Sequence, residues 1–325
     1  MKKILIAILA AVLALSVVFT ASADGWKELY DQKEYEAAYP LIEKAAEAGD
    51  PDAIAHLAEC LANGYGTEAD PEKAYELAMK AADAGNVYGM FILGNCFLNG
   101  WGTAQDYAKA LEWFQKAADL GEAKAMANIA YIYQEGLGTA QDYTKALEWF
   151  QKAADLGEAK AMTNMAYIYQ EGLGTAQDYA KALEWYQKAA DLGDPYAFVN
   201  LGYMYEQGQG SEPDYAKAFE YFQKAADIGD PYGLADVAWM ILEDRVPDPD
   251  YAKAVEYFTR AAESGAPHAL FGLGECYYAG QGVEKDLEKA AEYYRKALEA
   301  GYEVVEPAEQ EHVKELLGEE AVTAP

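Results

Sequence analysis

Two adjacent blocks of this sequence, residues 106–141 and 142–177, repeat each other almost residue for residue. They differ only at Ala108/Thr144, Ala127/Thr163 and Ile129/Met165. The second block starts 36 residues after the first (142 − 106). A repeat of this length is the signature of a solenoid, in which each repeat buries its apolar face only by stacking on its neighbours.

The same period continues along nearly the whole chain. Each repeat has an acidic residue before an amphipathic segment and a glycine after it. These positions are Glu34, Asp70, Asp106, Asp142, Asp178, Asp214, Asp250 and Asp286, and Gly49, Gly85, Gly121, Gly157, Gly193, Gly229, Gly265 and Gly301. An unbroken repeat predicts one elongated all-α domain over residues 34–301. Residues 24–33 are expected to form an N-terminal capping helix, and residues 302–325 a C-terminal capping helix and tail.

Within the central repeat, the residue pattern predicts two helices. Asp106 is a good N-cap for a helix over 107–120, which we call helix B. Gly121 suits the left-handed position that ends this helix. After a short turn, helix A is expected over 123–135. The side chains expected on the buried stripe of helix B are Ala110, Trp113, Phe114 and Ala117.

Helix A carries its own start signal and two positions that are always small. In three repeats helix A begins with Asp-Pro, in which aspartate is the N-cap and proline is the first helical residue. The small positions predict a close approach of helices, where a larger side chain would clash. They are Ala53, Gly89, Ala125, Ala161, Ala197, Gly233 and Ala269, and Ala58, Gly94, Ala130, Ala166, Gly202, Ala238 and Gly274.

The first residues read as a secretory signal peptide over residues 1–23. Lys2 and Lys3 are followed by an apolar run over 4–20 and by the small residues Ala21-Ser22-Ala23. Cleavage before Asp24 would place the protein in the periplasm or outside the cell, without stable membrane insertion. The alternative is an uncleaved membrane anchor, which the small-residue cleavage site disfavours.

The net charge of the chain restricts the classes of molecule that it can bind. The formal net charge is −30, and removal of Lys2 and Lys3 would make it −32. Such a surface repels phosphate backbones, so the sequence predicts no nucleic-acid binding. The acidity is spread over all repeats, which favours a role in solubility and in keeping a monomer dispersed. The alternative is a preference for cationic partners.

The three cysteines fall at one position of the repeat. Cys96 lies 36 residues after Cys60, and Cys276 lies 180 residues after Cys96. The central repeat has the apolar Ile132 at that position. Packed helices lie about 8–10 Å apart, whereas a disulfide needs Cα atoms within about 7 Å. We therefore expect three buried, reduced thiols.

The combined pattern A-x-A-x-x-x-[LI]-[AG]-x-x-[YC]-x-x-G-x-G-T-x-x-D-Y-x-K-A-x-E-W-[FY]-x-K-A-A-x-x-G resembles the Sel1-like repeat, a longer-period relative of the tetratricopeptide repeat. The resemblance covers about Glu34 to Gly301. It implies antiparallel helix pairs stacked into a right-handed superhelix, with helix A lining the concave side. It also implies a role in protein–protein interaction or as an adaptor. Exported relatives with a disulfide in each repeat exist, and this chain departs from them because it lacks those cysteines.

Signals for catalysis are absent from the sequence. Ser211 and Ser264 follow the signal segment, and neither stands in S-x-x-K or G-x-S-x-G. His56, His268 and His312 lie in different repeats, with no H-E-x-x-H motif. We therefore predict no enzyme activity, no cofactor and no metal site.

An acidic loop over residues 244–250 breaks the repeat, because Asp244 and Val246 replace a glycine pair found in the other repeats. Its carboxylates allow a calcium site to be considered, but the spacing is not that of an EF-hand loop. A locally rebuilt loop is favoured.

By the resemblance to tetratricopeptide stacking, two positions of helix A face the groove. The middle repeats place an amide or carboxylate at one position and an aromatic residue at the other. An asparagine can bind a peptide backbone with both donor and acceptor, and aromatic rings add contact area. A purely structural role in packing between helices is the alternative. The candidate pairs are Asn128/Tyr131, Asn164/Tyr167, Asn200/Tyr203 and Asp236/Trp239.

These observations favour an exported protein that binds a protein or peptide through its concave face. Binding of glycans or peptidoglycan fragments is an alternative, because sugars are recognised by the same side chains. An envelope hydrolase is a weaker alternative, because no polar trio is singled out in one repeat.

Overall fold

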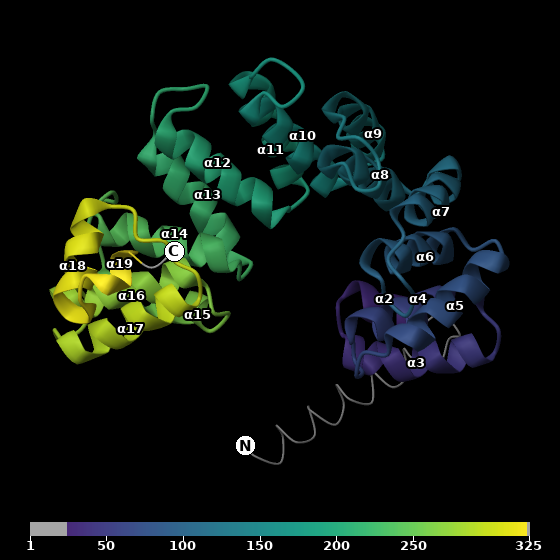
Figure 1. Cartoon of the computed structure of the whole chain (residues 1–325), viewed down its shortest axis with the longest axis horizontal. Coiled ribbons are helices and arrows are strands. Elements are labelled where there is room, and N and C mark those ends of the chain that lie inside the picture. Colours follow the sequence, from purple (N-terminus) through teal and green to yellow (C-terminus); the bar gives the residue numbers. More distant parts are fainter. Residues whose placement is uncertain (1–24, 324–325) are drawn as a thin grey trace, which may run out of the picture. The chain divides into compact units, whose positions relative to one another are not determined.

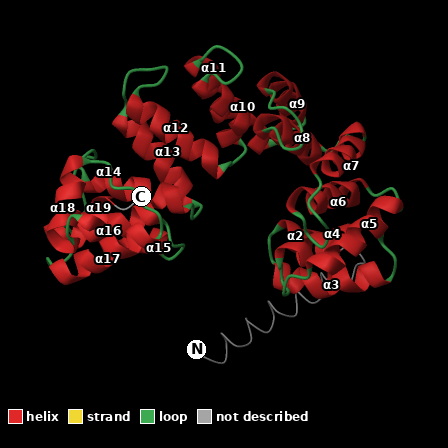
Figure 2. Cartoon of the chain, viewed as in Figure 1, coloured by secondary structure: helices red, strands yellow, loops and turns green. Residues whose placement is uncertain are grey.

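The computed structural model describes residues 25–323, and the regular structure in that range is helical throughout (Figure 2). The predicted signal peptide lies outside the described residues. Within them, no helix combines the length and the apolar character that crossing a membrane requires. The chain divides into two compact units, residues 1–158 and 159–325, which we call the N-terminal and C-terminal units and describe separately.

The N-terminal unit begins with the short α2 (Gly25–Asp31), which packs on α3 and buries Trp26. Helices of type B and type A then alternate along the chain, and each packs on the next (Figure 1). The B helices are α3 (Tyr35–Glu47), α5 (Pro71–Asp83), α7 (Tyr107–Asp119) and α9 (Tyr143–Asp155), and the A helices are α4 (Pro51–Asn63), α6 (Val87–Asn99) and α8 (Ala123–Glu135).

The C-terminal unit continues the alternation and ends with two additional helices. The A helices α12, α14 and α16 pack on one another as well as on the B helices between them. The A helices are α10 (Ala159–Glu171), α12 (Pro195–Gln207), α14 (Pro231–Leu242) and α16 (Pro267–Ala279), the B helices are α11 (Tyr179–Asp191), α13 (Tyr215–Asp227), α15 (Tyr251–Ala262) and α17 (Leu287–Glu299), and the last helices are α18 (Pro307–Leu317) and α19 (Glu320–Thr323).

The predicted helix signals operate as expected in the central repeat. The Asp106 carboxylate accepts a hydrogen bond from the Lys109 backbone amide at 3.0 Å, as an N-cap does. Gly121 has a φ of 93°, in the left-handed region that ends the helix. Glu34 differs, because its side chain caps nothing at the start of α3. The predicted all-α fold of stacked helix pairs is confirmed.

The small positions of helix A are confirmed as sites of close packing. A Cβ atom placed on Gly94 would lie 2.5 Å from the ring of Phe114, and one on Gly89 would lie 2.5 Å from the Cβ of Ala81. Both distances are far below van der Waals contact, so helices α6, α5 and α7 can approach this closely only because these residues are glycines.

One residue of the predicted buried stripe packs against the core but is only partly buried. Ala110, Phe114 and Ala117 are buried, but Trp113 is only half-buried. Its ring is covered by Lys116, whose Nζ lies 3.7 Å from the ring centroid. Trp113 stands at the edge of the apolar stripe, where a cation–π contact one turn away replaces burial in the core.

The three cysteines are buried, as predicted, and each is a free thiol. Burial raises the pKa of Cys60, Cys96 and Cys276 to about 12. These thiols are therefore protonated at neutral pH and pack as small apolar side chains.

The irregular loop after α14 and the C-terminal tail differ from the regular repeat. Asp244 occupies the position of a helix-ending glycine and adopts a φ of 56°, which aspartate tolerates better than most residues. Within the predicted C-terminal capping helix and tail, residues 320–323 form the additional turn α19. This turn packs on α18, which buries Val313.

Candidate functional site

The four predicted pairs are divided between the two compact units. Asn128 and Tyr131 lie on α8 of the N-terminal unit, and the other three pairs lie on α10, α12 and α14 of the C-terminal unit. In the N-terminal unit, the Asn128 amide donates to Asn95 Oδ1 on α6 at 2.8 Å. The Tyr131 side chain is 43% exposed. Asn128 therefore has a structural contact, while Tyr131 is exposed to solvent.

Three of the predicted residues line one cavity of about 350 Å³ in the C-terminal unit, which we call the Asn164 cavity. The rings of Tyr167 and Tyr196 are 45% and 54% exposed, so they offer open apolar faces with polar tips. The lining residues are Lys160, Thr163, Asn164, Tyr167, Asp194, Tyr196 and Asn200.

The polar groups of the Asn164 cavity are partly fixed by the protein itself. Thr163 on α10 donates a hydrogen bond to the buried carboxylate of Asp194, at the start of α12. Asp194 occupies the N-cap position of α12 but makes no capping bond, and its carboxylate accepts from Thr163 instead. The Asn200 amide donates to the Tyr196 carbonyl at 2.8 Å, which leaves its Oδ1 as an acceptor.

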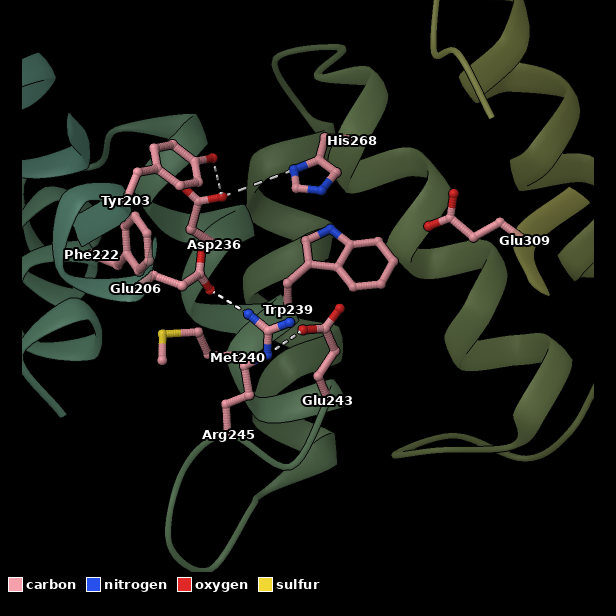
Figure 3. A pocket seen from close by; sticks show the side chains of 10 residues that line it. All are labelled: Tyr203, Glu206, Phe222, Asp236, Trp239, Met240, Glu243, Arg245, His268 and Glu309. Atoms are coloured by element: carbon pink, nitrogen blue, oxygen red, sulfur yellow. Dashed lines mark hydrogen bonds and ion pairs between the residues drawn. The ribbon is translucent and has the colours of Figure 1, made fainter. Parts of the chain in front are cut away.

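The remaining predicted residues line a second cavity, of about 210 Å³, which we call the Asp236 cavity (Figure 3). Tyr203 on α12 and Asp236 and Trp239 on α14 belong to the predicted pairs. His268 on α16 and Glu309 on α18 complete the sides seen in Figure 3. The cavity is also lined by Glu206, Phe222, Met240, Glu243 and Arg245.

Asp236 is the most buried acidic group in this cavity, with 4% of its surface exposed. Its Oδ1 accepts a hydrogen bond from the Tyr203 hydroxyl at 2.7 Å and lies 4.0 Å from His268 Nδ1. Burial raises the pKa of Asp236 to about 7, and the negative charges of Glu206 and Asp230 act in the same direction. Burial lowers the pKa of His268 to about 4, so its ring is neutral at neutral pH.

The walls of the Asp236 cavity are aromatic. The Trp239 ring stacks on His268, with centroids 5.2 Å apart and an interplanar angle of 18°. The Tyr203 ring packs edge-on against Phe222 at 5.1 Å. Trp239 and Tyr203 therefore contribute to the packing between helices and also line the cavity.

In the end repeats, the helix A position that is aromatic in the middle repeats carries a glutamate. Glu59 on α4 accepts hydrogen bonds from Tyr30 and Tyr88, and Glu275 on α16 accepts one from Tyr294 at 2.6 Å. These carboxylates are satisfied within the protein. Among the middle repeats, which carry tyrosine or tryptophan at the same position, Tyr131 and Tyr167 are exposed to solvent.

Several lining residues were not identified from the sequence. Thr163 is one of the three differences between the two near-identical blocks, and that difference was the available signal. Arg245 lies in the loop that breaks the repeat, and its guanidinium lies between Glu206 and Glu243 in Figure 3. Glu309 comes from the non-repeating end, where the period carries no information.

No group of three or more His, Cys, Asp or Glu side chains is placed to hold a metal ion within residues 25–323. In the acidic loop, the Asp244 carboxylate accepts a hydrogen bond from Tyr251. Between them, the two cavities present amides, carboxylates and tyrosine rings.

Comparison with known proteins identifies the repeat. The Sel1 repeat model matches seven segments, residues 51–86, 87–122, 123–158, 159–194, 195–230, 231–265 and 267–302. No curated protein matched the chain.

Two of the solved structures that are similar to this chain are more than a quarter identical to it over the matched residues. A Sel1 repeat protein from Oxalobacter formigenes is 27% identical, with a TM-score of 0.64, over 75% of this chain and 100% of that chain. A protective antigen of uropathogenic Escherichia coli strains, described as displaying an SLR fold, is 28% identical, with a TM-score of 0.50, over 86% of this chain and 67% of that chain. The resemblance drawn from the sequence is therefore confirmed. With seven matched repeats over residues 51–302, the chain belongs to the Sel1 repeat family.

Proposed function

We propose that this protein is an exported peptide-binding protein that uses the A helices of its C-terminal unit. Sel1 repeats generally mediate protein–protein interactions, and the scaffold is generally non-catalytic. The observation that carries the proposal is the Asn164 cavity, in which Asn164, Tyr167 and Asn200 converge from two helices. Export is supported by the signal-like sequence over residues 1–23.

The side chains of this cavity suit an extended peptide. A peptide group offers one donor and one acceptor, and an asparagine side chain can complement both. Tyr167 and Tyr196 add rigid, exposed rings, which are typical of binding hot spots. Like residues of neighbouring A helices are separated by about 10 Å, the length of about three extended residues. One segment of a peptide can therefore contact two successive helices.

The test is a selection of binders from a random peptide display library on the mature protein. The matched bait is Asn164→Ala/Tyr167→Ala, which alters the cavity and leaves the buried Ala161 and Ile168 of α10 in place. We expect peptides that bind the unaltered protein at least about tenfold more tightly than the variant. A library that yields no binder, or binders indifferent to the variant, would contradict the proposal. A carbohydrate array probed in parallel would reveal the glycan alternative.

A further inference from the structure

The Asp236 cavity contains more negative than positive charge. Its lining includes four carboxylates, those of Glu206, Asp236, Glu243 and Glu309, and one arginine, Arg245. The guanidinium of Arg245 pairs with Glu206 at 2.5 Å and with Glu243 at 2.8 Å. Within the described residues, Asp236 and Glu309 therefore form no ion pair with a lysine or arginine.

Two buried polar atoms in the lining lack a hydrogen-bond partner among the described residues. These atoms are Asp236 Oδ2 and Trp239 Nε1. The first belongs to a side chain with 4% exposure, and both residues line the cavity. A buried carboxylate oxygen with no partner is costly, so Asp236 would be stabilised by a donor that a ligand brings.

Glu309 adds a second uncompensated acidic group from another element. Its two oxygens accept only long hydrogen bonds from the Tyr302 hydroxyl, at 3.4 Å each. Burial raises the pKa of Glu309 to about 7, and the charges of Glu275, Glu306 and Glu243 act in the same direction. The carboxylates of Glu243 and Glu309, which both line the cavity, thus repel each other.

The residues that line the Asp236 cavity suit an organic cation better than a metal ion. Calcium or magnesium requires several convergent oxygen ligands, and no such group is present among the described residues. Trp239, Phe222 and Met240 instead give apolar surface beside the carboxylates. Alkyl stems of lysine and arginine pack on such surface, and their charged ends are attracted to carboxylates and to indole rings.

We propose that the Asp236 cavity binds the basic side chain of a peptide, whose ammonium or guanidinium group donates to Asp236 Oδ2 and is attracted by Glu309. This inference rests on the proposed peptide-binding function and extends it to a ligand with lysine or arginine. The pairing of Arg245 with Glu206 and Glu243 shows that a guanidinium fits this environment.

The titration of these carboxylates gives the binding a pH dependence. Asp236 faces Tyr203 and Glu206 on α12, Asp230 at the start of α14, and the neutral His268 on α16. None of these groups carries a positive charge at neutral pH. A bound cation would favour the ionised form of Asp236, so binding should weaken as the pH falls through about 7.

The experiment compares short capped peptides that carry arginine, lysine or the neutral analogue citrulline at one central position. Binding to the mature protein is measured by fluorescence anisotropy. We expect arginine or lysine to bind at least about tenfold more tightly than citrulline near pH 8. We expect most of this preference to disappear near pH 5.5, below the pKa of about 7 of Asp236 and of Glu309.

Two variants locate the effect. Asp236→Asn keeps the shape of the side chain and an acceptor for Tyr203, and it should abolish the preference for arginine or lysine over citrulline. Glu309→Gln tests the second carboxylate without altering a fully buried residue. The matched control is Glu184→Gln on α11, which changes the net charge equally at a side chain that pairs with Lys188. The control should keep the preference.

Equal binding of the arginine and citrulline peptides, or no binding of any of them, would overturn the inference. So would equally tight binding of the free amine agmatine, which would make the cavity a small-amine site. The proposed function is distinguishable, because it predicts that Tyr167→Ala weakens peptides with and without a basic residue alike.

Discussion

The Tyr203 hydroxyl donates a hydrogen bond to Asp236 Oδ1 at 2.7 Å and thereby connects α12 to α14. The two residues lie 33 positions apart and occupy the two predicted groove-facing positions of successive A helices. The same relation recurs in the N-terminal unit, where Asn128 donates to Asn95. These positions therefore contact each other between neighbouring repeats.

The burial of Asp236 predicts a stability that depends on pH. Its pKa is raised from 3.8 to about 7 in the folded protein. The folded state therefore holds this proton more tightly than the unfolded state does. The stabilisation is fully present below a pH of about 4 and is lost as the pH rises through about 7. The shift corresponds to about 4 kcal/mol of unfolding free energy between these limits.

Asp236→Asn removes this titration and keeps an acceptor for Tyr203. We expect the variant to be more stable than the unaltered protein near pH 8, and to lose that advantage near pH 4, in urea unfolding followed by circular dichroism. Glu184→Gln, at an exposed side chain, should show no such change. A difference between Asp236→Asn and the unaltered protein that is independent of pH would contradict the burial of a titrating carboxylate.

Replacing Gly94 or Gly121 by alanine should destabilise the fold, for a different reason at each position. At Gly94 a Cβ would meet the ring of Phe114 at 2.5 Å, so Gly94→Ala should destabilise by about 1–3 kcal/mol through overpacking. Gly121 has open space but a φ of 93°, so Gly121→Ala should cost about 1 kcal/mol through backbone strain. Thermal unfolding of both variants measures the difference. A harmless Gly94→Ala would show that helices α6 and α7 are less closely packed than described.

The buried thiols predict protection from alkylation. Cys60, Cys96 and Cys276 are buried, and their pKa values are raised to about 12. Iodoacetamide near pH 8 should leave the folded protein unmodified and should label three cysteines after denaturation without a reductant, as read by mass spectrometry. A mass that shows a Cys60–Cys96 disulfide would contradict the packing of the repeats.

Much of the fold could be predicted from the sequence because every repeat carries the same local signals. Asp106, Gly121 and the small residues of helix A act through neighbours that the period itself specifies. Trp113 was misplaced because periodicity does not distinguish the centre of an apolar stripe from its edge. His268, Arg245 and Glu309 were not identified as part of a cavity, because their contacts involve an irregular loop and a non-repeating end.

The candidate pairs predict separate effects on binding and on stability. Tyr167 is 45% exposed, so Tyr167→Ala should weaken peptide binding with little change in the unfolding free energy. Tyr203 packs on Phe222 and holds Asp236, so Tyr203→Ala should also destabilise the fold, by about 1–3 kcal/mol. The double variant should reduce affinity by at least about tenfold. Circular dichroism and a binding titration on each variant separate the two contributions. Unchanged affinity in folded Tyr167→Ala would favour a purely structural role.

Photo-crosslinking tests most directly whether ligands bind on the A helices of the C-terminal unit. A benzophenone side chain would replace Tyr167 on α10 in one variant and Leu192, at the end of α11, in a matched control. Leu192 is 56% exposed, so both labels are open to solvent. With a peptide selected on the unaltered protein, the account predicts efficient crosslinking from position 167 and little from position 192. Crosslinking from position 192 but not from position 167 would contradict it.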